Sequence, residues 1–190
     1  MAILPITMIG DNILRKKINK IKAIDNEIKD FIDNMFETMS NAGGIGLAAS
    51  QVGADRSIFI VDISKLEEEE EKEFDPLVFI NPKIVKYSEE QVVFEEGCLS
   101  IPDIRAEVER PESITIEYLD AEFKKQTMDA DNLLARVIQH EYDHLFGVLF
   151  TDLVDDEMKK RLKKPLNKIK KRKIDIEYPI STSIDYQLTL

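Results

Sequence analysis

The stretch "RVIQHEYDHLFGVLF", from Arg136 to Phe150, contains His140 and His144, the only two histidines in the chain. Residues four apart lie on one face of an α-helix, with Cβ atoms roughly 6 Å apart, and two imidazole nitrogens can bind one metal ion from that spacing. Glu141 is turned about 100° from His140 around the helix. It can therefore flank the ion and take a proton from a water molecule beside it, as the glutamate of H-E-x-x-H does. The stretch predicts a metal-binding helix; the alternative is two structural histidines in a hydrophobic core.

Two histidines do not complete a metal site, so a third ligand is needed. The protease pattern H-E-x-x-H-x-x-G-x-x-H is followed through Gly147, but Phe150 stands where its last histidine would be. The only cysteine, Cys98, lies in "FEEGCLSIP". A lone cysteine is usually a small buried hydrophobic residue. With two histidines, however, it would leave an open fourth position, which is typical of catalytic sites.

A glycine-rich loop, "GGIGLAASQVG", extends from Gly43 to Gly53. Three glycines within four residues allow the backbone to approach a ligand closely, although such a loop can also simply end a helix. No Gly-Lys-Ser or Gly-Lys-Thr follows, so the loop is not a phosphate-binding loop of a nucleotide-binding protein.

These three segments together resemble the peptide deformylases. That family contains the patterns G-x-G-L-A-A-x-Q, E-G-C-L-S and H-E-x-D-H. The chain matches them, in the same order, at Gly44–Gln51, Glu96–Ser100 and His140–His144. Looser similarity runs from "ILPI" near the start to about Asp152. The resemblance implies a hydrolase that removes the N-formyl group from the initiator methionine of newly synthesised polypeptides and releases formate.

The resemblance also implies a role for the residues at the metal. By position, Cys98, His140 and His144 are the expected ligands of one divalent ion. Ferrous iron is the family's usual metal, with Zn²⁺, Ni²⁺ or Co²⁺ as alternatives, and the ligand set suits several of these ions. Glu141 is expected to accept a proton from the attacking water and to deliver it to the leaving amine.

The substrate-binding part of the site follows from the same resemblance. The side-chain amide of Gln51 and the backbone N–H of Leu99 match the family's oxyanion donors. The substrate is an extended peptide end, which the glycine loop can pair with like an added strand. The residues assigned to substrate binding are Gly44, Ile45, Gly46, Glu96, Gly97, Leu133 and Val137. For the apolar members, which would enclose the methionine side chain, the alternative is an ordinary place in the core.

One supporting contact is expected behind the metal-binding helix. Asp143 lies within the H-E-x-D-H stretch, and we expect it to form an ion pair with Arg110 that orients the helix behind the metal. The alternative is a surface carboxylate that contributes little.

The pattern of the remaining chain predicts an α+β fold, in which antiparallel β-sheets surround the central helix that bears the metal-binding histidines. Residues 27–44 and 129–146 have helical spacing of apolar residues. Between them, residues 57–128 contain short, β-branched segments that are typical of antiparallel strands. The acidic insert Glu67–Glu73 reads as a solvated loop.

The C-terminal region is expected to differ from the rest. We predict a single catalytic domain over residues 1–190, with a basic helix at about 152–173 and a tail to residue 190. Pro165 should kink or end that helix, and the tail could add a strand.

Composition limits the partners. The net charge is -11, but Lys159–Lys173 holds ten Lys or Arg and no acid, so the remainder carries -21. This charge disfavours nucleic-acid binding by the bulk of the protein through charge alone, and we expect no DNA partner. The basic segment could contact ribosomal RNA through a salt-sensitive interaction. No apolar run is long enough to span a membrane. We find no secretory signal, and with a single cysteine a cytoplasmic location is expected.

Two other classes of protein share part of this pattern. A zinc endopeptidase would use H-E-x-x-H but would leave Cys98 and Gln51 without roles. A closed structural metal site would need a fourth protein ligand, and the chain has no further His or Cys. The deformylase reading gives each of the three segments a function.

Overall fold

The computed structural model describes residues 2–64 and 75–188. The acidic insert Glu67–Glu73, expected to be a solvated loop, lies outside this range. Within it, no helix is both long and apolar enough to cross a lipid bilayer.

The strands form two antiparallel sheets. The larger has five strands in the order β1-β2-β3-β6-β7, and the smaller pairs β4 with β5. The strands are β1 (Gly46–Ala48), β2 (Ile58–Val61), β3 (Leu77–Tyr87), β4 (Gln91–Cys98), β5 (Ile101–Pro111), β6 (Ile114–Leu119) and β7 (Lys125–Ala130). The helices are the 3-10 turns η1 (Asn12–Arg15) and η2 (Ala49–Val52), and the α-helices α1 (Asn26–Asn41), α2 (Asn132–His144), α3 (Phe150–Leu153) and α4 (Asp156–Lys170).

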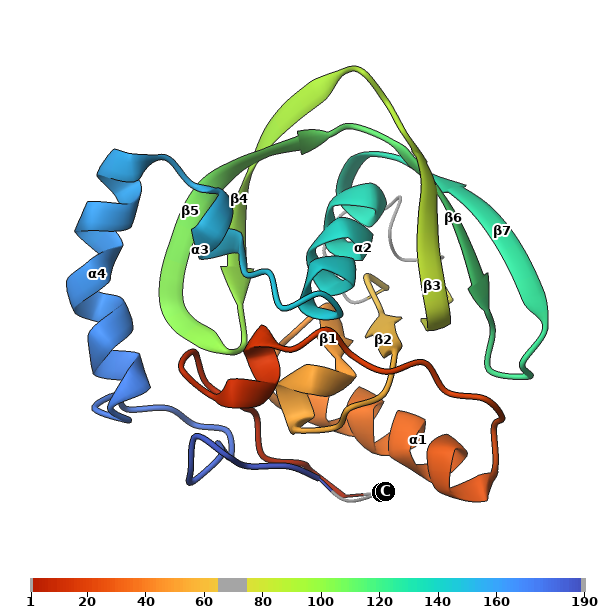
Figure 1. Cartoon of the computed structure of the whole chain (residues 1–190), viewed down its shortest axis with the longest axis horizontal. Helices are drawn as coiled ribbons and strands as arrows, with labels where there is room; N and C mark the ends of the chain where they lie inside the picture. The colour runs from red at the N-terminus through yellow and green to blue at the C-terminus, as the bar shows by residue number, and fades with distance from the viewer. Residues whose placement is uncertain (1, 65–74, 189–190) are drawn as a thin grey trace.

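Helix α2 occupies the centre of the molecule. The pair β4–β5 lies on one side of it and β3, β6 and β7 on the other, while α1 lies below (Figure 1). Ala135 and Ile138 of α2 are fully buried in the same cluster as Phe59 and Phe79 of the larger sheet. The predicted α+β architecture around the histidine-bearing helix is confirmed.

Several boundaries differ from the expected ones for local reasons. The helix predicted from residue 129 begins at Asn132, because β7 continues to Ala130 and Asp131 is still extended at φ -137° and ψ 177°. Helix α1 agrees with its prediction, and the Asp25 carboxylate accepts a hydrogen bond from the Ile28 N–H at its start. Such a cap satisfies one of the otherwise unpaired N–H groups of the first turn.

Of the two outcomes expected at Pro165, a kink or the end of the C-terminal helix, the end does not occur. Helix α4 continues to Lys170. Proline removes one hydrogen bond from a helix interior, but Leu162 and Ile169, on either side of Pro165, are both buried in a cluster that includes Ile104 of β5. Burial of both apolar residues holds the helix together across the proline.

Up to residue 188, the last that the structure describes, the tail adds no strand, although it pairs once with the body. Ile180 forms an isolated parallel bridge with Ile6, so the last described residues run beside the N-terminal segment (Figure 1). Pro179 and several polar residues interrupt the tail sequence, and the bridge is not extended into a longer ladder within the described residues.

Candidate metal centre

Three potential metal ligands from two distant segments converge beside α2. Cys98 ends β4, whereas His140 and His144 lie one turn apart on α2. One ligand atom from each residue lies within 4.8 Å of the other two, and the Cys98 Sγ is 3.4 Å from His144 Nε2. Sulfur and imidazole ligands in this number leave a fourth position open, as catalytic sites of this type require.

Glu96, next but one to Cys98, fixes the orientation of His140. Its Oε2 is 2.8 Å from His140 Nδ1, which leaves Nε2 as the ring nitrogen available to a metal. Arg110 donates two hydrogen bonds to the same carboxylate, at 2.6 and 3.0 Å, and Arg136 donates a third at 2.8 Å. Burial opposes ionisation of Glu96, but hydrogen bonds from His140 and Arg110 outweigh it and hold its pKa well below the usual range. A carboxylate that orients a histidine ligand in this way is common behind metal sites.

The expected ion pair between Arg110 and Asp143 is present. Arg110 Nη1 donates to Asp143 Oδ2 at 2.7 Å, and the Arg110 side chain is only 7% exposed. Arg110 therefore connects β5 both to Glu96 on β4 and to Asp143 on α2. The strand and the helix that supply the candidate ligands are held together by buried, charge-assisted hydrogen bonds.

Glu141 lies against the glycine loop, and one of its carboxylate oxygens makes no hydrogen bond to the described part of the chain. The residue is buried, and its Oε2 has no hydrogen-bond partner within the described part of the chain. A Cβ added to Gly46 would lie 2.5 Å from Glu141 Oε1, so the loop can approach only because this residue is glycine. Burial raises the pKa of Glu141 to about 7. A carboxylate with this pKa can both take up and release a proton near neutral pH.

These groups fit a bound divalent metal. Burial lowers the pKa of His144 well below its usual range, which favours the neutral imidazole that binds metals. The free Glu141 oxygen beside a cluster of one sulfur and two nitrogens suits a site in which water reacts next to an ion.

The side-chain amide of Gln51 points into the same centre from η2. Its Oε1 accepts a hydrogen bond from the Ala48 N–H at 2.8 Å, which fixes the amide orientation. Its Nε2 lies 3.4 Å from Cys98 Sγ and 3.3 Å from Ser100 Oγ. Leu99 is the first residue of the two-residue turn between β4 and β5, since Cys98 pairs with Ile101 across it. Both predicted oxyanion donors are thus adjacent to Cys98.

A cavity of about 560 Å³ opens onto this centre. It is lined by all the residues assigned to substrate binding from the sequence, namely Gly44, Ile45, Gly46, Glu96, Gly97, Leu133 and Val137. Leu133 and Val137 come from α2, whereas Gly44, Ile45 and Gly46 come from the glycine loop. The carboxylate of Glu96 is already bound by His140, Arg110 and Arg136, although the residue also lines the cavity.

Arg136 and Tyr178 are among the lining residues that were not anticipated from the sequence. Arg136 of α2 donates a hydrogen bond to Glu96. This contact depends on where β4 lies relative to α2, which the sequence does not show. Tyr178 reaches the cavity from the C-terminal tail. No local pattern marks it, because its contact at Leu99 is 79 residues away along the chain.

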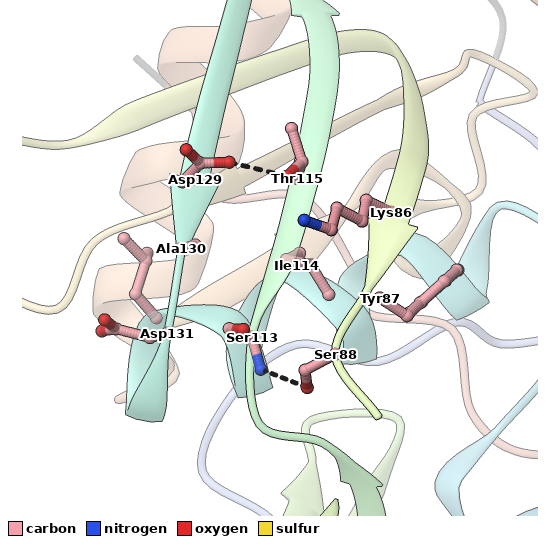
Figure 2. A pocket seen from close by; sticks show the side chains of 10 residues that line it. Lys86, Tyr87, Ser88, Ser113, Ile114, Thr115, Asp129, Ala130 and Asp131 are labelled. Carbon is pink, nitrogen blue, oxygen red and sulfur yellow. Dashed lines mark hydrogen bonds between the residues drawn. The ribbon is translucent and has the colours of Figure 1, made fainter. Parts of the chain in front are cut away.

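A second cavity, of about 450 Å³, lies between the ends of β3, β6 and β7 and the start of α2. Thr115 donates to Asp129 at 2.6 Å, and the Ser113 N–H donates to Ser88 Oγ at 3.1 Å (Figure 2). Its lining contains neither His nor Cys, and none of the assigned site residues belongs to it.

Comparisons with known proteins identify the same enzyme family that the metal centre and its cavity suggest. The family model described as polypeptide deformylase matches residues 3–160. A peptide deformylase of Salinibacter ruber is 44% identical over 188 residues, which cover 96% of each chain. One from Rhizobium meliloti is 52% identical over 154 residues, covering 81% of this chain and 86% of the relative.

Solved structures are similar over most of their length. The crystal structure of peptide deformylase 1B of Arabidopsis thaliana, in complex with an inhibitor, has a TM-score of 0.82 at 38% identity and covers 90% of this chain and 92% of its own. A peptide deformylase from Legionella pneumophila has a TM-score of 0.80 at 32% identity, covering 90% and 98%. The chain therefore belongs to the polypeptide deformylase family, the metalloenzymes that remove the formyl group from nascent polypeptides.

Proposed function

We propose that Cys98, His140 and His144 hold the catalytic metal ion of this deformylase and that Glu141 moves the proton. The observation that carries this assignment is the position of Cys98, whose sulfur lies 3.4 Å from His144 although the two residues are 46 apart in sequence. A buried glutamate with a free carboxylate oxygen then lies next to the three candidate ligands.

We propose Fe²⁺ as the native ion, with Zn²⁺, Ni²⁺ or Co²⁺ able to replace it. When bound, the ion supplies a Lewis acid that polarises the formyl carbonyl and makes water acidic enough to attack near neutral pH. The thiolate and two neutral imidazoles form a ligand set that suits all four ions.

Glu141 carries the proton through the reaction. Its unpartnered Oε2 accepts a proton from the attacking water and later delivers that proton to the leaving amine, as the formyl C–N bond breaks. The products are formate and a free methionine amino group. The close approach of Gly46 holds the Glu141 carboxylate in place, so that proton transfer occurs from a fixed position.

Gln51 and Leu99 stabilise the negative charge that develops on the formyl oxygen. The hydrogen bond from Ala48 to Gln51 Oε1 directs the opposite side of the amide, its NH₂ group, toward the metal centre. The Leu99 N–H follows directly after the Cys98 ligand. Donors that are already oriented in the free enzyme stabilise a transition state without further ordering.

The methionine side chain lies in the apolar part of the cavity, between Ile45 on one side and Leu133 and Val137 on the other. The backbone of Gly44, Gly46 and Gly97 pairs with the peptide that follows the formylated residue. This mode of binding uses main-chain hydrogen bonds, so it tolerates many sequences beyond the first residue.

We propose that the chain acts as one catalytic unit in the cytoplasm, close to ribosomes. Helix α4 and the three residues after it carry the basic segment Lys159–Lys173 on a largely exposed surface. Ten positive charges in a protein of net charge -11 favour an RNA surface as the docking partner.

The assignment is tested by metal analysis and formate release with a formyl-Met peptide, using protein purified without oxygen. Glu141→Ala should keep its metal and lose turnover by about 10²–10⁴, the usual contribution of a general acid–base residue. Cys98→Ser should lose metal as well as activity, because serine is a poor ligand for these ions. Normal turnover by metal-loaded Glu141→Ala would remove the proton-transfer role, and unchanged metal affinity in Cys98→Ser would remove the sulfur ligand.

A further inference from the structure

The chain beyond α4 runs back toward the metal centre and is attached to the N-terminal segment on the way. Residues 174–188 run back along the N-terminal segment, where Ile180 pairs with Ile6. Asp11, which is completely buried, accepts hydrogen bonds from the Ser181 hydroxyl and from the Arg172 guanidinium. The buried carboxylate therefore connects the start of the chain to Arg172, just after α4, and to Ser181 of the tail.

Tyr178 of this tail bonds directly to the turn that carries a proposed oxyanion donor. Its hydroxyl donates to the Leu99 carbonyl oxygen at 2.7 Å, and the residue lines the substrate cavity. Burial raises the pKa of the phenol, which is in any case protonated at neutral pH and able to donate. The deformylase family model ends at residue 160, so Tyr178 lies outside the matched region.

The turn formed by Leu99 and Ser100 is held from several directions. The Ile9 N–H donates to the Ser100 carbonyl at 2.9 Å, and Gln51 Nε2 lies 3.3 Å from the Ser100 hydroxyl. Both of these contacts act on Ser100. The Tyr178 bond acts on Leu99, the residue whose N–H points toward the reaction in the proposed mechanism.

We infer that Tyr178 is a positioning residue for deformylation. Through this residue the C-terminal tail contributes to the active site. A hydrogen bond on the Leu99 carbonyl fixes the rotation of the backbone on one side of the Leu99 Cα. With Cys98 fixed on the other side by the metal centre, the Leu99 N–H keeps one direction. The inference rests on the proposed function, because it requires the Leu99 N–H to stabilise the formyl oxygen in the transition state.

The expected effect is smaller than the loss of a donor. Removing an oxyanion donor lowers kcat by about 10²–10³. Without the Tyr178 hydroxyl, the Leu99 N–H remains but is held less firmly, so we expect kcat to fall about tenfold, with little change in KM. An interaction that matters mainly in the transition state lowers kcat and kcat/KM together.

The test compares Tyr178→Phe with Tyr186→Phe in the full-length, metal-loaded protein. The first change removes the hydroxyl and keeps the ring. The second is a matched control on the same tail, since the Tyr186 ring lies against Gly53 rather than against the turn. For each variant, kcat and KM for a formyl-Met peptide are measured by formate release well below the melting temperature, together with metal content.

The inference predicts a kcat about tenfold lower in Tyr178→Phe at unchanged KM and full metal content, with Tyr186→Phe within twofold of wild type. It is overturned by a wild-type kcat, by a change confined to KM, by loss of metal, or by an equal loss in both variants. Wild-type protein that released no formate at all would instead refute the proposed function.

Discussion

At the scale of single residues, the site depends on how closely the glycine loop approaches α2. Gly46 leaves room for Glu141, whose Oε1 would lie 2.5 Å from any added Cβ. Gly44 similarly leaves room for the Leu99 side chain, whose Cδ1 would lie 2.8 Å from a Cβ. These distances are shorter than side-chain atoms can approach without moving. The loop sequence is thus matched to the residues it faces, one of which carries the reaction's proton.

The substitution Gly46→Ala tests this packing. The new methyl group should displace the Glu141 carboxylate, and a displacement of about 1 Å can lower turnover by about 10². Metal content should stay at the wild-type level, because Gly46 contributes no ligand. We expect kcat to fall by about 10² in a formate-release assay on metal-loaded protein. A wild-type kcat would show that the loop can accommodate a methyl group without moving Glu141.

At the scale of elements, a buried charge network joins β4, β5 and α2. Glu96 accepts hydrogen bonds from Arg110 and Arg136, and Arg110 also binds Asp143. Removing one partner from such a network leaves the others charged and unpaired in a poorly solvated place. The network therefore contributes to stability as well as to the orientation of His140.

Glu96→Ala should lower the free energy of unfolding by about 3–5 kcal/mol, the usual cost of breaking a buried ion pair from one side. Glu107→Ala, at an exposed position of β5, is the matched control and should change stability by less than about 0.5 kcal/mol. Urea unfolding of both variants gives the values. Equal stability of the two variants would contradict a structural role for the network.

The same network shows how far the sequence could predict the structure. The longer helices α1, α2 and α4, most strands and the residues that gather at the metal centre follow from local spacing and three short motifs, so they could be predicted. Within residues 57–128, β4 had no strand pattern of its own, because its strongly buried residue is the charged Glu96 while Val93 is 55% exposed, the reverse of the usual pattern. The role of Tyr178 was equally hidden, since it depends on where the tail returns. Pro165 does not end α4, because local propensity gave way to tertiary packing.

At the scale of the whole molecule, charge is separated between the catalytic body and one outer helix. Helix α4 lies at the edge of the molecule, outside β5 (Figure 1), and turns its buried residues Leu162 and Ile169 toward the body. Its exposed lysines include Lys159, Lys163 and Lys164. A basic surface on the outside of an acidic enzyme can bring it to an RNA surface without blocking the cavity.

Reversing charge on α4 tests this docking. The variant Lys159→Glu/Lys163→Glu/Lys164→Glu should sediment with ribosomes less than wild type at low salt, and the difference should shrink as salt is added. Its activity on a short formyl-Met peptide should remain unchanged, because these side chains lie outside the cavity lining. Equal co-sedimentation of the two proteins would exclude this helix as the docking surface.

The central claim is that one sulfur and two imidazoles bind the same ion. X-ray absorption at the zinc edge of the zinc-loaded protein measures this directly. The account predicts one sulfur scatterer at about 2.3 Å and two imidazole nitrogens at about 2.0–2.1 Å, with the sulfur shell lost in Cys98→Ser. A wild-type spectrum without sulfur in the first coordination shell would contradict it.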